Sequence, residues 1–303
     1  MAGSVVRLAL TFPTPVLPAQ PMPPANPYSS APALVQALAL PASAYVGQRI
    51  AKSLLMKQIA NLPGSTATDK RLATNLLAEL HWLAALKPST CGLAAWQTYT
   101  HDYLEIAVLH AVLRIDPCTT SSRQTSQTTR LLELIHRTIP YPVVLVLTYA
   151  NGSADNSAEQ LSLAHKRLSL GKGSAMVIEQ LTTTKIIAVS AYSDWAKGQF
   201  VQYIAFNNPS SAALPNLHAR YNDWLSAVDA LAASEHTGQF TVSPNAKAAA
   251  SRRSAMQKHA ELGQQLARAR AQARKASQLA QRAAIHLTIV DLMTQRQALL
   301  GSL

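Results

Sequence analysis

The chain has 303 residues, of which 48% are hydrophobic and 14% are charged, and its formal net charge is +12. This composition excludes a chain that is disordered as a whole, because the apolar residues suffice for a substantial core. A transmembrane helix is not expected, since Asp102, Glu105 and His110 interrupt the most apolar run before it reaches about 18 residues. The apolar segment at the amino terminus is too short for a cleaved signal peptide. We therefore expect a cytoplasmic protein, or one exported without such a signal.

The first 45 residues are rich in proline and alanine, a composition that favours extended, solvated chain. We predict a flexible leader over residues 1–45. Apolar residues at helical spacing then predict two amphipathic helices that form a hairpin. Their apolar positions are Ile50, Leu54, Leu55 and Ile59 in the first helix and Leu72, Leu76, Leu77, Leu80 and Leu83 in the second.

Within residues 88–115, apolar or aromatic side chains fall on every side from Leu93 to Leu113, which predicts a helix in the centre of the domain. Ser89 or Thr90 can cap this helix, so that Cys91 lies in its first turn. The free N–H groups and the positive end of the helix dipole would favour the thiolate there. The second cysteine, Cys118, would lie about 35–40 Å away along a continuous helix, so we expect two free thiols and a reducing compartment.

Further along the chain the pattern changes from helices to strands. We predict a helix at residues 130–137, a buried strand at 141–149 and a short helix at 158–168. Three strands at 174–181, 185–192 and 199–206 should pair antiparallel, and a helix from Leu217 to Leu231 should close the domain. Helices followed by a small antiparallel sheet indicate an α+β domain over residues 46–236.

Part of this domain resembles the papain-like cysteine peptidases, including their bacterial-effector branches. The resemblance covers roughly residues 88–212 and consists of a cysteine segment, STCGLAAW, that opens the central helix, followed by apolar strands that end at Asn207 and Asn208. It implies that Cys91 is the nucleophile and that Asn207 or Asn208 orients the catalytic base. Ser174 stands where that family has its histidine, so that either another histidine is the base or the chain is an inactive form. The implied function is a thiol-dependent hydrolase or acyl-transfer enzyme, of peptidase or deamidase type, acting on a protein substrate.

The remaining histidines give no clear base. His101 and His110 would lie on the central helix, with His101 about 15 Å along the axis from Cys91, and His136 and His165 on separate helices. A metal site is not indicated, because the cysteines stand alone and the histidines lack ligand spacing. We expect no cofactor.

The carboxyl-terminal segment, residues 246–303, holds ten Lys and Arg against Glu261 and Asp291, which is +8 of the net charge of +12. We predict one long helix of roughly 50 residues with a coiled-coil seam. The seam positions are Leu262, Leu266, Ala269, Ala273, Ala276, Ala280, Ala283, Leu287 and Val290. This helix needs a partner, either a second copy through residues 250–300 or a surface of its own core. The alternative function is thus a non-catalytic interaction protein that assembles through this helix or binds acidic partners with it, including the phosphate backbone of nucleic acid.

Overall fold

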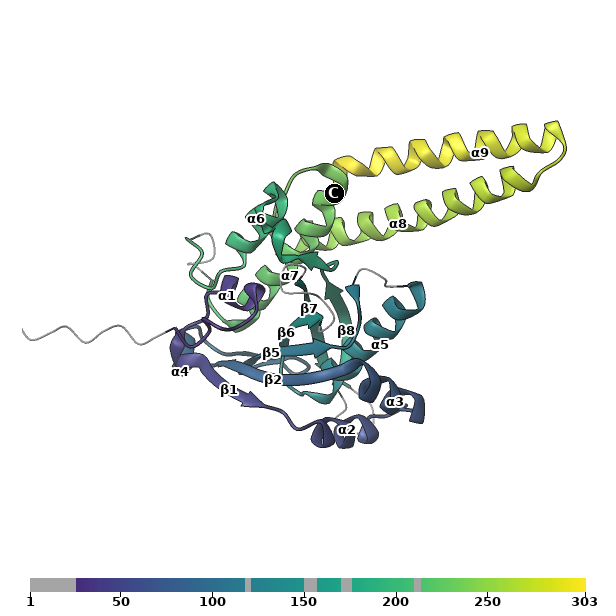
Figure 1. The fold of residues 1–303 in the computed structure, drawn as a ribbon. Helices are drawn as coiled ribbons and strands as arrows, with labels where there is room; N and C mark the ends of the chain where they lie inside the picture. The colour runs from purple at the N-terminus through teal and green to yellow at the C-terminus, as the bar shows by residue number, and fades with distance from the viewer. Residues whose placement is uncertain (1–25, 118–120, 150–156, 170–175, 210–213) are drawn as a thin grey trace, which may run out of the picture.

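A mixed β-sheet forms the centre of the computed structural model, which describes residues 26–117, 121–149, 157–169, 176–209 and 214–303 (Figure 1). Within these residues the strand order is β1-β2-β5-β6-β7-β8, and β9 pairs with β7. The strands are β1 (Tyr45–Arg49), β2 (Leu77–Leu86), β5 (Ile106–Leu113), β6 (Val143–Tyr149), β7 (Ala158–Leu168), β8 (Met176–Thr183) and β9 (Ile187–Ala188). Strands β5 and β6 are parallel, and the other neighbours are antiparallel. The predicted α+β class is confirmed, with a larger sheet than expected.

The parallel pair β5 and β6 is buried on both faces. Helix α5 (Ser122–Thr138) connects the two strands, since parallel neighbours need a crossover. Ile106 and Val108 of β5 enter one core, whereas Ala107 and Leu109 enter the other. Both strands are therefore almost entirely apolar, as is usual where helices cover both faces of a sheet.

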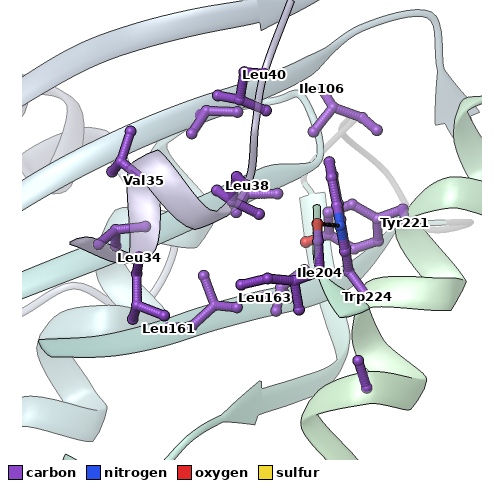
Figure 2. Close-up of a cluster of buried hydrophobic side chains, with 14 of the residues drawn as sticks. Leu34, Val35, Leu38, Leu40, Ile106, Leu161, Leu163, Ile204, Tyr221 and Trp224 are labelled. Carbon is purple, nitrogen blue, oxygen red and sulfur yellow. Dashed lines mark hydrogen bonds between the residues drawn. The ribbon is translucent and has the colours of Figure 1, made fainter. Parts of the chain in front are cut away.

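Helices cover the two faces of the sheet in separate groups. The first face packs against α1 (Ala33–Ala37), α6 (Trp195–Tyr203) and α7 (Leu217–Thr237). The opposite face packs against α2 (Lys52–Asn61), α3 (Ala67–Leu76) and α5. Figure 2 shows the first core, in which Leu38, Leu163 and Trp224 meet from three different elements. The indole Nε1 of Trp224 donates a hydrogen bond of 2.8 Å to the carbonyl of Ile204.

The end of the predicted leader belongs to the core. Its buried residues are Tyr28, Leu34, Val35, Leu38, Leu40 and Ala44. The carboxylate of Glu159 on β7 accepts hydrogen bonds from the backbone N–H groups of Ala33, at 2.7 Å, and Leu34, at 2.6 Å, which fixes the start of α1. The boundary predicted at residue 45 thus lies inside the folded part, and residues 1–25 lie outside the described residues.

The predicted central helix over residues 88–115 is wrong. Helix α4 (Pro88–Cys91) ends at Gly92, which has a left-handed φ of 75°. A short hairpin of β3 (Trp96–Gln97) and β4 (Asp102–Tyr103) follows, and the most apolar part of the run is β5. A continuous apolar run is common to buried helices and buried strands, so its periodicity alone cannot distinguish them.

Other predicted segments also change type. Strand β2 replaces the end of the second predicted helix, and β7 replaces the predicted helix at 158–168, because each pairs with strands on both sides. Most of the predicted strand at 199–206 lies in α6, and the one at 185–192 keeps two strand residues, in β9. The predictions at 130–137 and 141–149 and of the closing helix are confirmed by α5, β6 and α7. The strand predicted at 174–181 is confirmed by β8 from Met176 on, and residues 174–175 lie outside the described residues.

The carboxyl-terminal segment forms two long helices instead of one. Helix α8 (Ala246–Lys275) and helix α9 (Leu279–Ala298) pack side by side after a short connection at 276–278, and the pair projects from the core (Figure 1). A one-turn 3-10 helix, η6 (Leu299–Ser302), leads back to the core. We call residues 246–298 the basic arm. Its residues form no helix apolar enough to cross a bilayer, and neither do the other described residues.

The predicted seam is correct for α8 only. Leu262, Leu266 and Ala269 are buried against Ile289 and Leu292 of α9. Leu287 and Val290, which were expected in the same seam, are instead 74% and 60% exposed. An alanine-rich helix of this length buries little area by itself, and folding back supplies its partner within the chain. Self-association through residues 250–300 stays a prediction.

Candidate functional site

Cys91 lies at the wrong end of a helix for an activated thiol. It is the last residue of α4, and its Sγ donates a hydrogen bond of 3.0 Å to the carbonyl of Lys87. Burial raises the pKa of the thiol, and a backbone hydrogen bond from Leu93 and the positive charge of Arg220 only partly offset this. Among the described residues no histidine is hydrogen-bonded to the thiol. The structure therefore removes the helix-dipole argument for a thiolate at Cys91.

The other predicted site residues lie apart from the thiol. Ser174 lies outside the described residues. Asn207 and Asn208 line a surface pocket of ≈ 550 Å³ that also contains Tyr203 and Phe240. The Nδ2 of Asn208 donates to the carbonyl of Tyr203 at 2.8 Å, so this side chain holds the loop after α6. Neither asparagine is hydrogen-bonded to a histidine in the described part of the chain.

In a Cys118→Ser variant, which leaves Cys91 as the sole cysteine of the chain, we expect slow alkylation of the folded protein by iodoacetamide at pH 7. The thiolate is the reacting species, and the raised pKa of Cys91 reduces its fraction. The rate should be several times lower than that of a free cysteine peptide, with the urea-unfolded variant as the control for full reactivity. A folded protein that reacts as fast as the peptide would restore Cys91 as a candidate nucleophile.

A second group of chemically active side chains lies where β4, β7 and α7 meet. The Tyr103 hydroxyl donates to Nδ1 of His165 at 2.6 Å, and Nε2 of His165 donates to Oδ1 of Asn222 at 2.7 Å. Nδ2 of Asn222 in turn donates to Nε2 of His218 at 3.0 Å. The ring of Trp96 stacks on His218, with centroids 3.8 Å apart. Sequence periodicity missed this network because it placed His165 on a helix.

Every member of this network already has a partner. Burial lowers the pKa of His165 to about 4, so the ring is neutral at pH 7 and its two nitrogens are used in hydrogen bonds. Networks that are satisfied in this way stabilise a particular arrangement of elements. The described residues also contain no group of three or more histidine, cysteine or acidic side chains suited to a metal ion. The hydrogen bonds of the network connect β4, β7 and α7.

The basic arm is different, because most of its cations form no ion pair with an acidic residue in the described part of the chain. Within the arm, Arg253 pairs with Asp229 at 3.1 Å and Lys258 approaches Glu261 at 4.0 Å. The other eight cations of the arm form no ion pair with a described residue. The stretch from 262 to 290, which is the outer part of the arm, contains no acidic residue at all. Its exposed cations are Arg268, Arg270, Arg274, Lys275 and Arg282.

The comparisons with known proteins identify the chain by family alone. No curated protein and no solved structure gave a significant match. The profile of one domain of unknown function matches residues 38–295, which contain the sheet and nearly all of the basic arm. The chain therefore belongs to the DUF4391 family.

Proposed function

We propose that the protein is an interaction module that binds the phosphate backbone of nucleic acid through the basic arm. The observation that carries this proposal is the outer part of the arm, residues 262–290, with five exposed Lys and Arg and no acidic residue. Exposed cations without partners in the protein attract a polyanion and gain free energy by releasing its counterions.

The shape and composition of the arm support backbone contacts instead of base recognition. Helix α8 has 30 residues, so it extends over about 45 Å and can meet several phosphates of one strand or duplex. Residues 246–303 contain no Phe, Tyr or Trp that could stack on bases. We therefore expect binding with little dependence on sequence.

The hydrolase hypothesis has less support. A thiol enzyme needs a base within hydrogen-bond reach of the sulfur, and the hydrogen bonds of the Cys91 thiol among the described residues are to backbone groups, of Lys87 and Leu93. The raised pKa of Cys91 also disfavours the nucleophilic form. The arm, by contrast, has the charge and the exposure that its proposed partner requires.

Binding of a fluorescein-labelled 30-base-pair duplex of arbitrary sequence, followed by anisotropy between 50 and 200 mM salt, tests this function. If the five outer cations each contact one phosphate, the logarithm of the affinity should fall against the logarithm of salt with a slope of about −4.5. The triple variant Arg268→Gln, Arg274→Gln and Lys275→Gln should reduce the steepness of this slope by about 3, because three contacts are lost.

The matched control is a second triple variant, in which three exposed cations of the core are replaced by glutamine. These are Lys57, Lys70 and Arg123, which form no ion pair among the described residues. Both triple variants have the same net charge, so only the position of the charges differs. Equal binding by the two variants would contradict the proposal. So would binding of polyglutamate but not of the duplex, a result that would assign the arm to an acidic protein.

A further inference from the structure

A pocket of ≈ 340 Å³ lies at the root of the basic arm, where α7, α8 and α9 meet. This pocket, which we call the root pocket, combines side chains that are far apart in the sequence. Its lining includes Glu235, His236, His259, Arg270, Met293 and Arg296. Two arginines and two histidines thus line the same pocket.

The positive charge in the root pocket is not neutralised by the protein. Glu235 is the acidic residue of its lining, and it pairs with Lys185. Neither Arg270 nor Arg296 forms an ion pair with a described residue. The Nε of Arg296 is buried without a hydrogen-bond partner, and Arg270 approaches only the sulfur of Met293, at 3.9 Å. Buried guanidinium N–H groups normally have acceptors, so Arg296 is an unsatisfied donor in the lining of the pocket.

The two histidines add donors to the same place. The rings of His236 and His259 have centroids 4.4 Å apart, and His259 is only 5% exposed. The described residues offer no hydrogen bond to the ring nitrogens of His259. Burial, and then the nearby charges of Arg296 and His236, lower the pKa of His259. A bound anion would reverse the effect of those charges and would accept a hydrogen bond from the ring.

We propose that the root pocket binds one phosphate group. A phosphate offers several acceptor oxygens, which suits two guanidinium groups and two imidazole rings better than a single carboxylate does. This inference rests in part on the proposed function, because the phosphate is taken to be one of the backbone of a nucleic acid that follows α8. Arg270 is both an outer cation of the arm and a member of the root pocket, so one strand can reach both.

Inorganic phosphate is the first probe, titrated by calorimetry into the full chain at constant ionic strength. Arg270→Gln and Arg296→Gln should each weaken phosphate binding by about tenfold, the factor expected when a hydrogen bond between charged groups is lost. Arg274→Gln is the control, because it removes an exposed arm cation that does not line the pocket. Arg270 is itself exposed, so its substitution should leave the helix content measured by circular dichroism unchanged.

The duplex is the second probe, and it separates the two proposals. If the pocket holds a backbone phosphate, inorganic phosphate should compete with the duplex, and Arg270→Gln should weaken duplex binding more than Arg274→Gln does. A different result would be that Arg270→Gln and Arg274→Gln weaken duplex binding equally, while only Arg270→Gln and Arg296→Gln reduce the affinity for inorganic phosphate. That result would assign the pocket to a free phosphate compound and overturn the backbone assignment. Phosphate binding without duplex binding would contradict the proposed function and the backbone assignment, and would leave the pocket as a site for a free phosphate compound. Wild-type protein that binds no phosphate at millimolar concentration would overturn the pocket.

Discussion

Acidification from pH 7 to pH 5 should lower the free energy of unfolding by about 4 kcal/mol, because His110 and His165 are buried in neutral form. Burial lowers the pKa of each to about 4, from an ordinary value of 6.5. Between these two pKa values the unfolded chain binds more protons than the folded chain. The contribution of the two histidines to the free energy of unfolding is therefore fully present above about pH 6.5 and is lost as the pH falls towards 4. Each histidine contributes about 2 kcal/mol of this loss at pH 5. His136, whose pKa burial lowers further, acts in the same direction.

Urea unfolding at pH 5, 6, 7 and 8 measures the effect. The variants His110→Gln and His165→Gln should each be less stable at pH 7, because a hydrogen bond is altered, but should lose less stability on acidification. His286→Gln, on the exposed side of α9, is the control and should follow the wild type. Burial raises the pKa of Glu159 and Asp229, which opposes the acid loss, so the comparison of variants isolates the histidines. Parallel pH curves for all four proteins would contradict this explanation.

Replacement of Arg220 by methionine should lower the free energy of unfolding by about 3–5 kcal/mol, the range for breaking a buried ion pair. Arg220 is 1% exposed, and its guanidinium lies 4.8 Å from the ring centre of Phe206. Its Nη1 donates to Asp223 at 3.1 Å, and its Nη2 donates to the carbonyl of Phe206. Methionine fills part of the volume but supplies no donor to the acidic group or to the carbonyl.

Lysine at position 220 should recover only part of this stability, because an ammonium group cannot reproduce the planar fork or stack on the ring. Arg123→Met, at an exposed position of α5, should change the free energy of unfolding by less than about 0.5 kcal/mol. Chemical denaturation of the three variants at pH 7 provides the measurement. An Arg220→Met protein within about 1 kcal/mol of the wild type would show that the pair is not essential to the core.

The contrast between β5 and β6 shows how far local sequence predicts this fold. Strand β6 follows prolines and precedes an Asn-Gly pair, so local sequence correctly predicts a buried strand from its short apolar run. Strand β5 has nearly the same composition, but it continues an apolar run that starts with a helix-capping pattern near Cys91. Its type is decided by pairing with β2 and β6, which are distant in sequence, and periodicity does not report such contacts.

The basic arm and the root pocket also differ in how far local sequence predicts them. The unpaired charge of the basic arm follows from counting residues in one continuous segment, so sequence alone predicted it. The turn at residues 276–278 contains neither proline nor glycine, and nothing local indicated that the helix folds back there. The root pocket joins His236, His259, Arg270 and Arg296 from three helices, and it exists only because of that turn. Sequence spacing could not have grouped these four residues.

Both ends of the basic arm are fixed to the core. Ala233 of α7 packs with Ala255 of α8 and with Leu303, which η6 brings back to the root of the arm. A hairpin held at both ends cannot rotate independently as a helix on a single flexible tether can. The arm and the sheet should therefore diffuse as one elongated body, with a larger frictional coefficient than a sphere of the same mass. Any nucleic acid bound along α8 would be held in one orientation relative to the sheet.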